Sequence, residues 1–277
     1  MTIEVRTDDR LRLVGVLLAA SDWPEFEQHQ KPYKAHRVAD AAHKYFAPHR
    51  ERSAAKAIRL LAGNGEGLPA MFAYALNQNW PDDFLPRQNR FLAAANPLAF
   101  FLQHQTDFAQ AEADATAVLA RADLGQFLNE LCGKQSRSFT FVPNLLYPGR
   151  QSVAASSPTE IVVSAPPPIA WGTSHPWRYS ERPDEALAII SEAFARFLFA
   201  EVAPAQAEVL GLAAAVLFLR EAEGPEAGDQ FMVMEKKTRG LKQLPAVVAL
   251  LENILAERRA GKYPSGIQDY AAQFREA

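Results

Sequence analysis

Apolar residues in the first 133 positions recur at intervals of three and four, the spacing that gathers them on one face of an α-helix. In DRLRLVGVLLAAS, residues 9–21, this pattern joins Leu11, Val14 and Leu18. Proline and glycine separate the helical segments from one another. Further helices are predicted over residues 34–49, 51–63, 68–80, 100–108 and 111–133. The N-terminal half is therefore predicted to be a helical lobe.

The pattern changes after this lobe, where aromatic and β-branched residues gather between prolines. Phe139–Val142 and Ile161–Val163 are the cores of two predicted strands, and an apolar helix over Asp184–Glu201 follows them. Another helix is predicted after Pro204. These elements predict an α+β fold that is mostly α, with a small sheet packed beside the helix. The predicted lobes are residues 1–133 and 134–277, joined in one compact unit.

The helix over Asp184–Glu201 has the length, apolar face and central glutamate of the helix that reads His-Glu-x-x-His in zinc peptidases. Ser191 and Ala195 stand four residues apart, the spacing at which two imidazoles from one helix face reach one Zn²⁺. Glu192 holds the position of the general base. Glu208, in the next helix, precedes eleven uninterrupted apolar residues and stands in the first helical turn, where the helix dipole favours negative charge.

A loop rich in proline and aromatic residues, APPPIAWGTSHPWRYSERPDE, leads into this helix. Loops of this composition often line a cleft, so the candidate cleft residues are Trp171, His175, Trp177 and Tyr179. Packing of the two tryptophans onto the helices explains the pattern equally well. His29, His36 and His43 recur at intervals of seven, which predicts a solvent-exposed stripe because histidines two turns apart do not grip one ion.

Composition narrows the class of protein. The chain has 277 residues, of which 48% are hydrophobic, and can bury a substantial core. Its net charge is -3, with Lys and Arg scattered among Asp and Glu, which argues against nucleic acid as a partner.

The first ten residues lack the apolar core of a signal peptide, and the longest apolar run, Val209–Leu219, is too short to cross a bilayer. We expect a cytoplasmic protein with no membrane partner. The single cysteine, Cys132, excludes an intrachain disulfide and a thiolate-based metal site.

The order of these landmarks resembles the bacterial metallopeptidase-like family called domain of unknown function 4932, whose active site is of the gluzincin type. The resemblance covers most of the chain and rests on order and spacing. The segments that carry it are LRLVGVLLAASDWPEF, HKYFAPHRERSAAKAIRLL, FTFVPNLLYP, QFMVMEKKTRGL and KYPSGIQDY. It implies a zincin-like core beside the helical N-terminal lobe.

Carried over residue by residue, the resemblance places Ser191 and Ala195 at the family's zinc-binding histidines, Glu192 at its general base and Glu208 at its third ligand. Neither Ser191 nor Ala195 supplies an imidazole, so the resemblance implies a decayed site without zinc or another cofactor. It also implies that Glu192 and Glu208 face one another, which should raise the pKa of one carboxyl. The expected relief comes from Arg178, Arg196 or Arg220.

Three classes of function are compatible with this pattern. The first is a catalytically inactive peptidase-like protein that binds a peptide or protein partner. The second is a metal-dependent hydrolase whose site is rebuilt from His175, Glu192 and Glu208. The third is a structural or assembly protein in which side chains fill the former cleft. The sequence leaves the identity of any ligand and the oligomeric state open.

Overall fold

The computed structural model describes residues 2–23, 29, 34–63, 67–81, 83–147, 151–263 and 265–275. Parts of three segments that carry the family resemblance, at residues 24–26, 148 and 264, lie outside this description. The helices of the N-terminal half are α1 (Asp9–Ala20), α3 (Arg37–Phe46), α4 (Ser53–Gly63), α5 (Gly67–Asn77), α6 (Phe84–Ala95), α7 (Pro97–Gln103), α8 (Gln105–Leu119) and α9 (Leu124–Cys132). Those of the C-terminal half are α10 (Pro183–Ala200), α11 (Ala207–Ala222), α12 (Pro225–Arg239), α13 (Leu244–Arg259) and α14 (Ile267–Tyr270).

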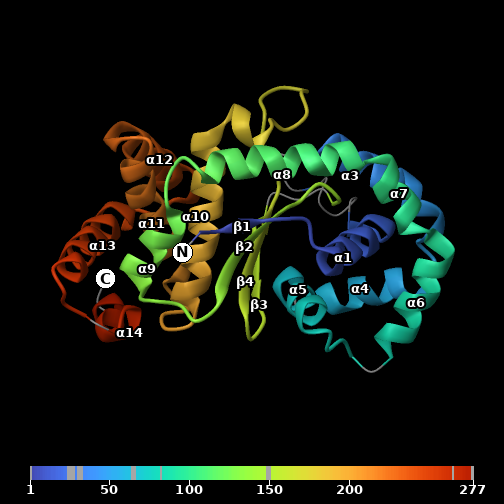
Figure 1. The fold of residues 1–277 in the computed structure, drawn as a ribbon, viewed down its shortest axis with the longest axis horizontal. Helices are drawn as coiled ribbons and strands as arrows, with labels where there is room; N and C mark the ends of the chain where they lie inside the picture. Colours follow the sequence, from blue (N-terminus) through green and yellow to red (C-terminus); the bar gives the residue numbers. More distant parts are fainter. Residues whose placement is uncertain are drawn as a thin grey trace.

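A small sheet lies at the centre of the molecule, between two groups of helices (Figure 1). Its strands are β1 (Glu4–Val5), β2 (Ser138–Pro143), β3 (Val153–Ser156) and β4 (Glu160–Ala165). They lie in the order β1-β2-β4-β3, with β1, β2 and β4 parallel and β3 antiparallel to β4. Helices α1 and α3 to α7 occupy one side in Figure 1, and α9 to α14 occupy the other. The predicted α+β fold, mostly α with a small sheet, is confirmed at this level.

Helix α10 packs directly on the sheet, as predicted. Pro183 opens the helix at a position that needs no backbone N–H, and Asp184 and Glu185 stand in the first turn, where the helix dipole favours acids. Phe194 is fully buried, and its ring centroid lies 5.3 Å from that of Phe139 in β2. The contact fixes α10 against the strand β2.

Two glycines set the spacing of the C-terminal helices. A Cβ added to Gly211 of α11 would lie 2.7 Å from the Cβ of Arg196 and 3.0 Å from the carbonyl oxygen of Glu192, both in α10. A Cβ added to Gly228 of α12 would lie 2.6 Å from the carbonyl oxygen of Val216 in α11. Since larger residues would collide with backbone at both positions, α10, α11 and α12 lie close together.

An ion cluster fastens α1 to the sheet. Asp8, which is 3% exposed, caps α1 by accepting from the backbone N–H of Arg10. Its carboxylate also lies 2.5 Å from the Arg6 guanidinium and 2.6 Å from that of Arg10, and both arginines lie 2.7 Å from Glu160 of β4. Burial alone would raise the pKa of Asp8, but the bonds from Arg10 and Arg6 lower it to about 2.

Several sequence predictions need correction. Residues 111–133 are not one helix, because α8 ends at Leu119 and Asp123 caps a new helix by accepting from the backbone N–H of Gln126 at 2.8 Å. Helix α8 also begins earlier than predicted, at Gln105. The strands β1 and β3 were not predicted. Within the described ranges, no helix is both long and apolar enough to cross a membrane.

Candidate functional site

The two positions that the family resemblance assigns to zinc-binding histidines lie in the packed interior of α10. Ser191 and Ala195 are both 0% exposed. The Ser191 hydroxyl donates to the carbonyl oxygen of Leu187 at 2.6 Å, and the carbonyl oxygen of Ala188 lies 3.2 Å away. A serine hydroxyl has one hydrogen to donate, and here it bonds the preceding helical turn. Neither side chain therefore presents a group to an open space.

Glu192 is a buried acid on a different face of the same helix. It is 5% exposed, and its Oε1 lies 3.3 Å from Nη1 of Arg196, one helical turn later. This contact lacks hydrogen-bond geometry, so Oε1 has no hydrogen-bond partner within the described structure. Burial raises the pKa of Glu192, and the nearby Arg196 and Arg239 oppose that rise. The predicted rise in the pKa of one carboxyl is confirmed for Glu192.

Arg239 connects the two acids. Glu208 stands in the first turn of α11 with its side chain 58% exposed, and its Oε1 lies 3.1 Å from Nη1 of Arg239. Arg239 also binds Glu235 at 2.6 Å and acts electrostatically on Glu192. The Glu208 carboxylate in turn contributes to the raised pKa of Glu192. The two acids thus belong to one electrostatic cluster, with guanidinium groups beside both.

Of the three arginines expected to relieve these carboxylates, one does so. Arg196 lies beside Glu192 and also donates to the backbone oxygen and the hydroxyl of Ser152 at 3.2 Å each. Arg220 instead binds Asp229 of α12 at 2.7 Å. Arg178 lines a separate cleft. Arg239 was missed because it is far from both acids in the sequence and no spacing pattern relates it to α10.

A cleft of about 330 Å³ lies where β4 ends, between the loop after that strand and helices α3 and α8. We call it the histidine cleft. Its lining includes His36, Arg37, Asp107, Gln110, Asp114, Pro167, His175, Pro176, Trp177, Arg178, Tyr179 and Glu181. Three of the four predicted cleft residues line it, namely His175, Trp177 and Tyr179. The carboxyl ends of parallel strands are a common place for ligand sites in sheets with helices on both faces.

The loop that closes the cleft is held in place by several hydrogen bonds. The backbone N–H of Trp177 donates to the carbonyl oxygen of Pro168 at 3.0 Å, which folds the loop back on itself. Lys34 donates to the carbonyl oxygen of Ser174 at 2.8 Å. Tyr179 is buried, and its hydroxyl donates to the carbonyl oxygen of Ala165 at 2.6 Å. The tip of the loop is different, since Trp171 is 83% exposed and is not a lining residue of the cleft.

The two histidines of the cleft have complementary hydrogen-bonding roles. Nδ1 of His36 accepts from the backbone N–H of Val38 at 3.2 Å and so caps α3. Burial lowers the pKa of His36 to about 4, so at neutral pH its proton is on Nε2. Nδ1 of His175 lies 3.1 Å from the carbonyl oxygen of Ala35 and must donate to it. Nε2 of neutral His175 is then an acceptor, so the pair offers one donor and one acceptor.

Charged groups in the cleft are largely tied to one another. Arg37 binds Asp107, which also lies 3.1 Å from Nδ1 of His104. Asp114 is 9% exposed and accepts from Gln110 at 2.9 Å and from Ser180 at 3.0 Å. The prediction of an exposed histidine stripe is wrong for His43, which is half-buried within α3, and for His36, which is half-buried at the start of that helix. The sequence signal was its place just before a helix, where a side-chain acceptor caps the first turn.

The positions that the family resemblance assigns to the active site do not line the histidine cleft. Ser191, Glu192, Ala195 and Glu208 are not among the lining residues of the cleft. In the described part of the chain, no three His, Cys, Asp or Glu side chains are grouped so that they could hold a metal ion. His175, Glu192 and Glu208 are therefore not assembled.

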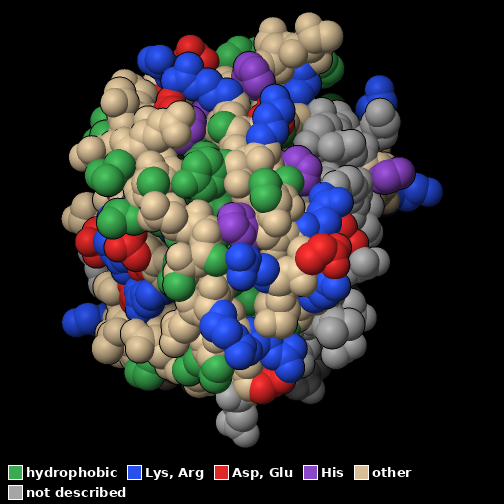
Figure 2. Space-filling model, turned by 90° about the vertical axis from the view of Figure 1, so that its right-hand side faces the viewer, with side chains coloured by type: hydrophobic (Ala, Val, Ile, Leu, Met, Phe, Trp, Pro, Cys, Tyr) green, Lys and Arg blue, Asp and Glu red, His purple; other side chains and the backbone are tan. Residues whose placement is uncertain are grey.

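The face of the molecule on the side of α4, α6 and α7 carries histidine, lysine and arginine side chains, with acidic and apolar side chains among them (Figure 2). Several of the cations on these helices are paired, such as Lys56 of α4 with Glu51 and Arg87 of α6 with Asp83. Pairing of this kind on a surface neutralises charge but adds little stability. This face is therefore a weaker candidate for a specific site than the histidine cleft.

Comparison with known proteins gave no match: no protein-family model, no curated protein and no solved structure is similar to this chain. Any function proposed for the protein therefore rests on the geometry of the chain itself.

Proposed function

We propose that the protein is a catalytically inactive, metallopeptidase-like protein that binds a peptide segment in the histidine cleft. The inactive part of the proposal is supported by α10, where Ser191 and Ala195 occupy the histidine positions and are fully enclosed. A zinc site of the peptidase type needs imidazoles at both positions and an open place for water. We also propose that the C-terminal half of the protein has a zincin-like core.

The observation that carries the binding part is that His36 and His175 line one cleft, each with Nδ1 engaged by a backbone group. A peptide group has one C=O acceptor and one N–H donor, and the two imidazoles offer the matching donor and acceptor. Beside them, Trp177 and the prolines of the loop supply apolar surface for side chains. The Trp177 ring is held by the Arg182 guanidinium, which lies 4.8 Å from its centroid.

A structural or assembly role is the second candidate, because side chains fill the interior around Ser191 and Ala195. The two candidates differ in what they require of the histidine cleft. A structural role leaves the cleft without a ligand, whereas the binding proposal requires one there. A hydrolase rebuilt from His175, Glu192 and Glu208 would need these residues to leave their present partners, and we do not propose it.

The test is a binding screen with a library of N-acetylated, C-amidated hexapeptides, followed by fluorescence anisotropy on the strongest peptide. We expect His175→Ala to weaken binding about tenfold or more, because the proposed hydrogen bond to the peptide and the bond that holds the loop to Ala35 are lost together. The matched control is Trp171→Phe, in the same loop but outside the cleft, which should bind as the unmodified protein does.

Two results would contradict the proposal. One is cleavage of any peptide in the library by the metal-loaded protein, seen by mass spectrometry. The other is binding that His175→Ala and Trp171→Phe affect equally, since the cleft would then have no part in it. Absence of any binding peptide would favour the structural role.

A further inference from the structure

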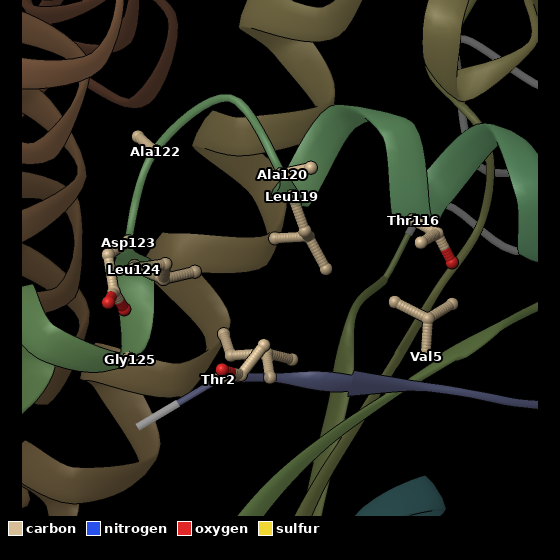
Figure 3. A pocket seen from close by; sticks show the side chains of 10 residues that line it. Thr2, Val5, Thr116, Leu119, Ala120, Ala122, Asp123, Leu124 and Gly125 are labelled. Atoms are coloured by element: carbon tan, nitrogen blue, oxygen red, sulfur yellow. The ribbon is translucent and has the colours of Figure 1, made fainter.

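A second cavity, of about 360 Å³, lies beside the edge of the sheet. It is bounded by β1 on one side and by the end of α8, the start of α9 and the turn between them on the other (Figure 3). In Figure 3 the side chains of Val5, Leu119 and Leu124 point into the space between these elements. Helix α8 lines both this cavity and the histidine cleft, but no residue lines both, and the proposed function does not use the cavity.

Strand β1 lies at the edge of the sheet, so the backbone N–H and C=O groups on its outer side have no neighbouring strand to pair with. Its partner β2 lies on one side only, with Glu4 opposite Thr140 and Val5 opposite Phe141. The backbone N–H of Arg6 donates to the carbonyl oxygen of Phe141 at 3.2 Å. Because backbone groups alternate in direction along a strand, those of Glu4 and Arg6 point to β2 and those of Ile3 and Val5 point away from it.

Thr7 is the next residue whose backbone groups point away from β2, and its N–H already has an acceptor. Thr7 follows Ile3 and Val5 at the same spacing, and its backbone N–H donates to a carboxylate oxygen of Glu112 in α8. The protein itself thus satisfies the last outward donor of this edge. Ile3 and Val5, both lining residues of the cavity, make no backbone hydrogen bond to a neighbouring strand on this side within the described structure. Open edges of this kind accept an added strand.

The other residues that line the cavity indicate which side chains an added strand should carry. Small and apolar side chains face the cavity, among them Leu119, Ala120, Ala122 and Leu124. Asp123 is the one charged side chain among the described lining residues. Its Oδ1 accepts from the backbone N–H of Gln126, and no hydrogen bond occupies Oδ2 in the described structure. Figure 3 places this carboxylate near Thr2, at the start of the edge.

We propose that the outer edge of β1 binds an extended, basic peptide segment as a fifth strand, with a lysine or arginine of the peptide at Asp123. The peptide backbone pairs with the N–H and C=O groups of Ile3 and Val5, and alternate apolar side chains enter the cavity under α8. The peptide is cationic because the described lining of the cavity offers a carboxylate and no cation. This site is independent of the histidine cleft, so the failure of one proposal leaves the other untouched.

The probe is the synthetic peptide Ac-Lys-Thr-Val-Thr-Val-NH2, whose lysine and valines share one face of an extended strand, with amide hydrogen exchange of the full chain followed by nuclear magnetic resonance. In the free protein we expect the amides of Ile3 and Val5 to exchange fast and that of Thr7 to exchange slowly, because Glu112 already binds it. Saturating peptide should slow exchange about tenfold or more at Ile3 and Val5 and leave Thr7 unchanged.

Two matched peptides test the backbone pairing. Only alternate N–H groups of an added strand face β1, so N-methylation of residues 2 and 4 and N-methylation of residues 3 and 5 should differ. One of them should abolish the protection of Ile3 and Val5, and the other should leave it in place. Equal effects of both would overturn the proposal, since side chains and not the backbone would then carry the binding.

Two variants test the protein side. Asp123→Asn should weaken binding about threefold and remove the preference for lysine over glutamate at peptide position 1, while asparagine still caps α9. The control Asp9→Asn, which changes an exposed acid of α1, should have no effect. Val5→Pro removes an outward N–H at an edge position that tolerates proline, and should abolish binding.

Other occupants of the edge give different results. Pairing of β1 with β1 of a second copy would protect Ile3 and Val5 without peptide, increasingly with protein concentration, and would overturn the proposal. Peptide binding without any change in exchange at Ile3 and Val5 would also overturn it. If Val5→Pro does not fold, as judged by circular dichroism, the methylated peptides and Asp123→Asn decide the outcome.

Discussion

The Glu192 carboxylate and the Arg196 guanidinium lie 3.3 Å apart on successive turns of α10, with Glu192 almost fully enclosed by protein. Under the proposed correspondence with a zinc peptidase, Glu192 would stand where a glutamate faces a metal-bound water, whereas here it faces a cation from its own helix. The surroundings of Glu192 favour an ion pair within α10.

Replacement of Glu192 by glutamine should leave the protein at least as stable at pH 7.5. Burial raises the folded-state pKa of Glu192 above its unfolded value, so the charged form disfavours folding. This cost is present above the folded-state pKa and disappears as the pH falls below the unfolded value, near 4.5. Urea unfolding at pH 7.5 and pH 4 should show any gain of Glu192→Gln at the higher pH only. Glu226→Gln, at an exposed acid of α12 outside this cluster, is the control.

Introduction of histidine at Ala195 should destabilise the protein rather than rebuild a metal site. Ala195 is 0% exposed, and the added ring has no space in a packed interior. We expect a loss of about 1–3 kcal/mol, typical of overpacking. Ala200→His, on the same helix at an exposed position, should cost much less. Urea unfolding compares the two variants, and equal stability of both would show that the interior around Ala195 is open.

Replacement of Asp8 by asparagine should cost about 2 kcal/mol at neutral pH, because its pKa is about 2 in the folded protein against 3.8 for the ordinary group. Asparagine still caps α1, so the loss comes from the bonds to Arg6 and Arg10. A lowered pKa stabilises the fold above the unfolded value and less so as the pH falls from about 4 to 2. The difference from the unmodified protein should shrink over that range. The neighbouring Asp9→Asn, at a side chain that is 88% exposed, should show no such dependence.

His36 should make the protein sensitive to mild acid. Its pKa is about 4 in the folded protein and 6.5 ordinarily, so the neutral form is the one that the fold prefers. Stability should be complete above about pH 6.5 and should fall by about 3 kcal/mol as the pH drops toward 4. His36→Asn keeps a capping acceptor for Val38 and cannot titrate, and should flatten this dependence. His29→Asn, at an exposed residue, serves as control, and an identical pH profile for both variants would contradict the assignment to His36.

The local pattern of residues was enough to predict helix α10 and two strands of the sheet. Pro183, Asp184 and Glu185 mark the start of α10, and the aromatic and β-branched residues around Phe139 and Ile161 mark two of the strands. Both signals depend on neighbouring residues only, and the predicted helix and strands form at these positions. The predicted proximity of these strands to α10 is visible in the contact of Phe139 with Phe194.

The remaining features depend on the tertiary fold. β3 reads Val-Ala-Ala-Ser and β1 has two residues, so neither shows the alternation of a longer strand. Arg239 enters the cluster around Glu192 only because Gly211 and Gly228 bring the helices close together. The burial of His36 depends on a loop that arrives from β4, more than a hundred residues later in the chain.

The central claim of the proposed function is that α10 binds no metal at the positions of Ser191 and Ala195. Elemental analysis after metal-free purification and reloading with zinc measures this directly, as the ratio of zinc to protein. We predict far less than one zinc per chain, because Ser191 and Ala195 provide no imidazole and are enclosed. One tightly held equivalent, lost on Glu208→Gln or on His175→Ala, would contradict this claim.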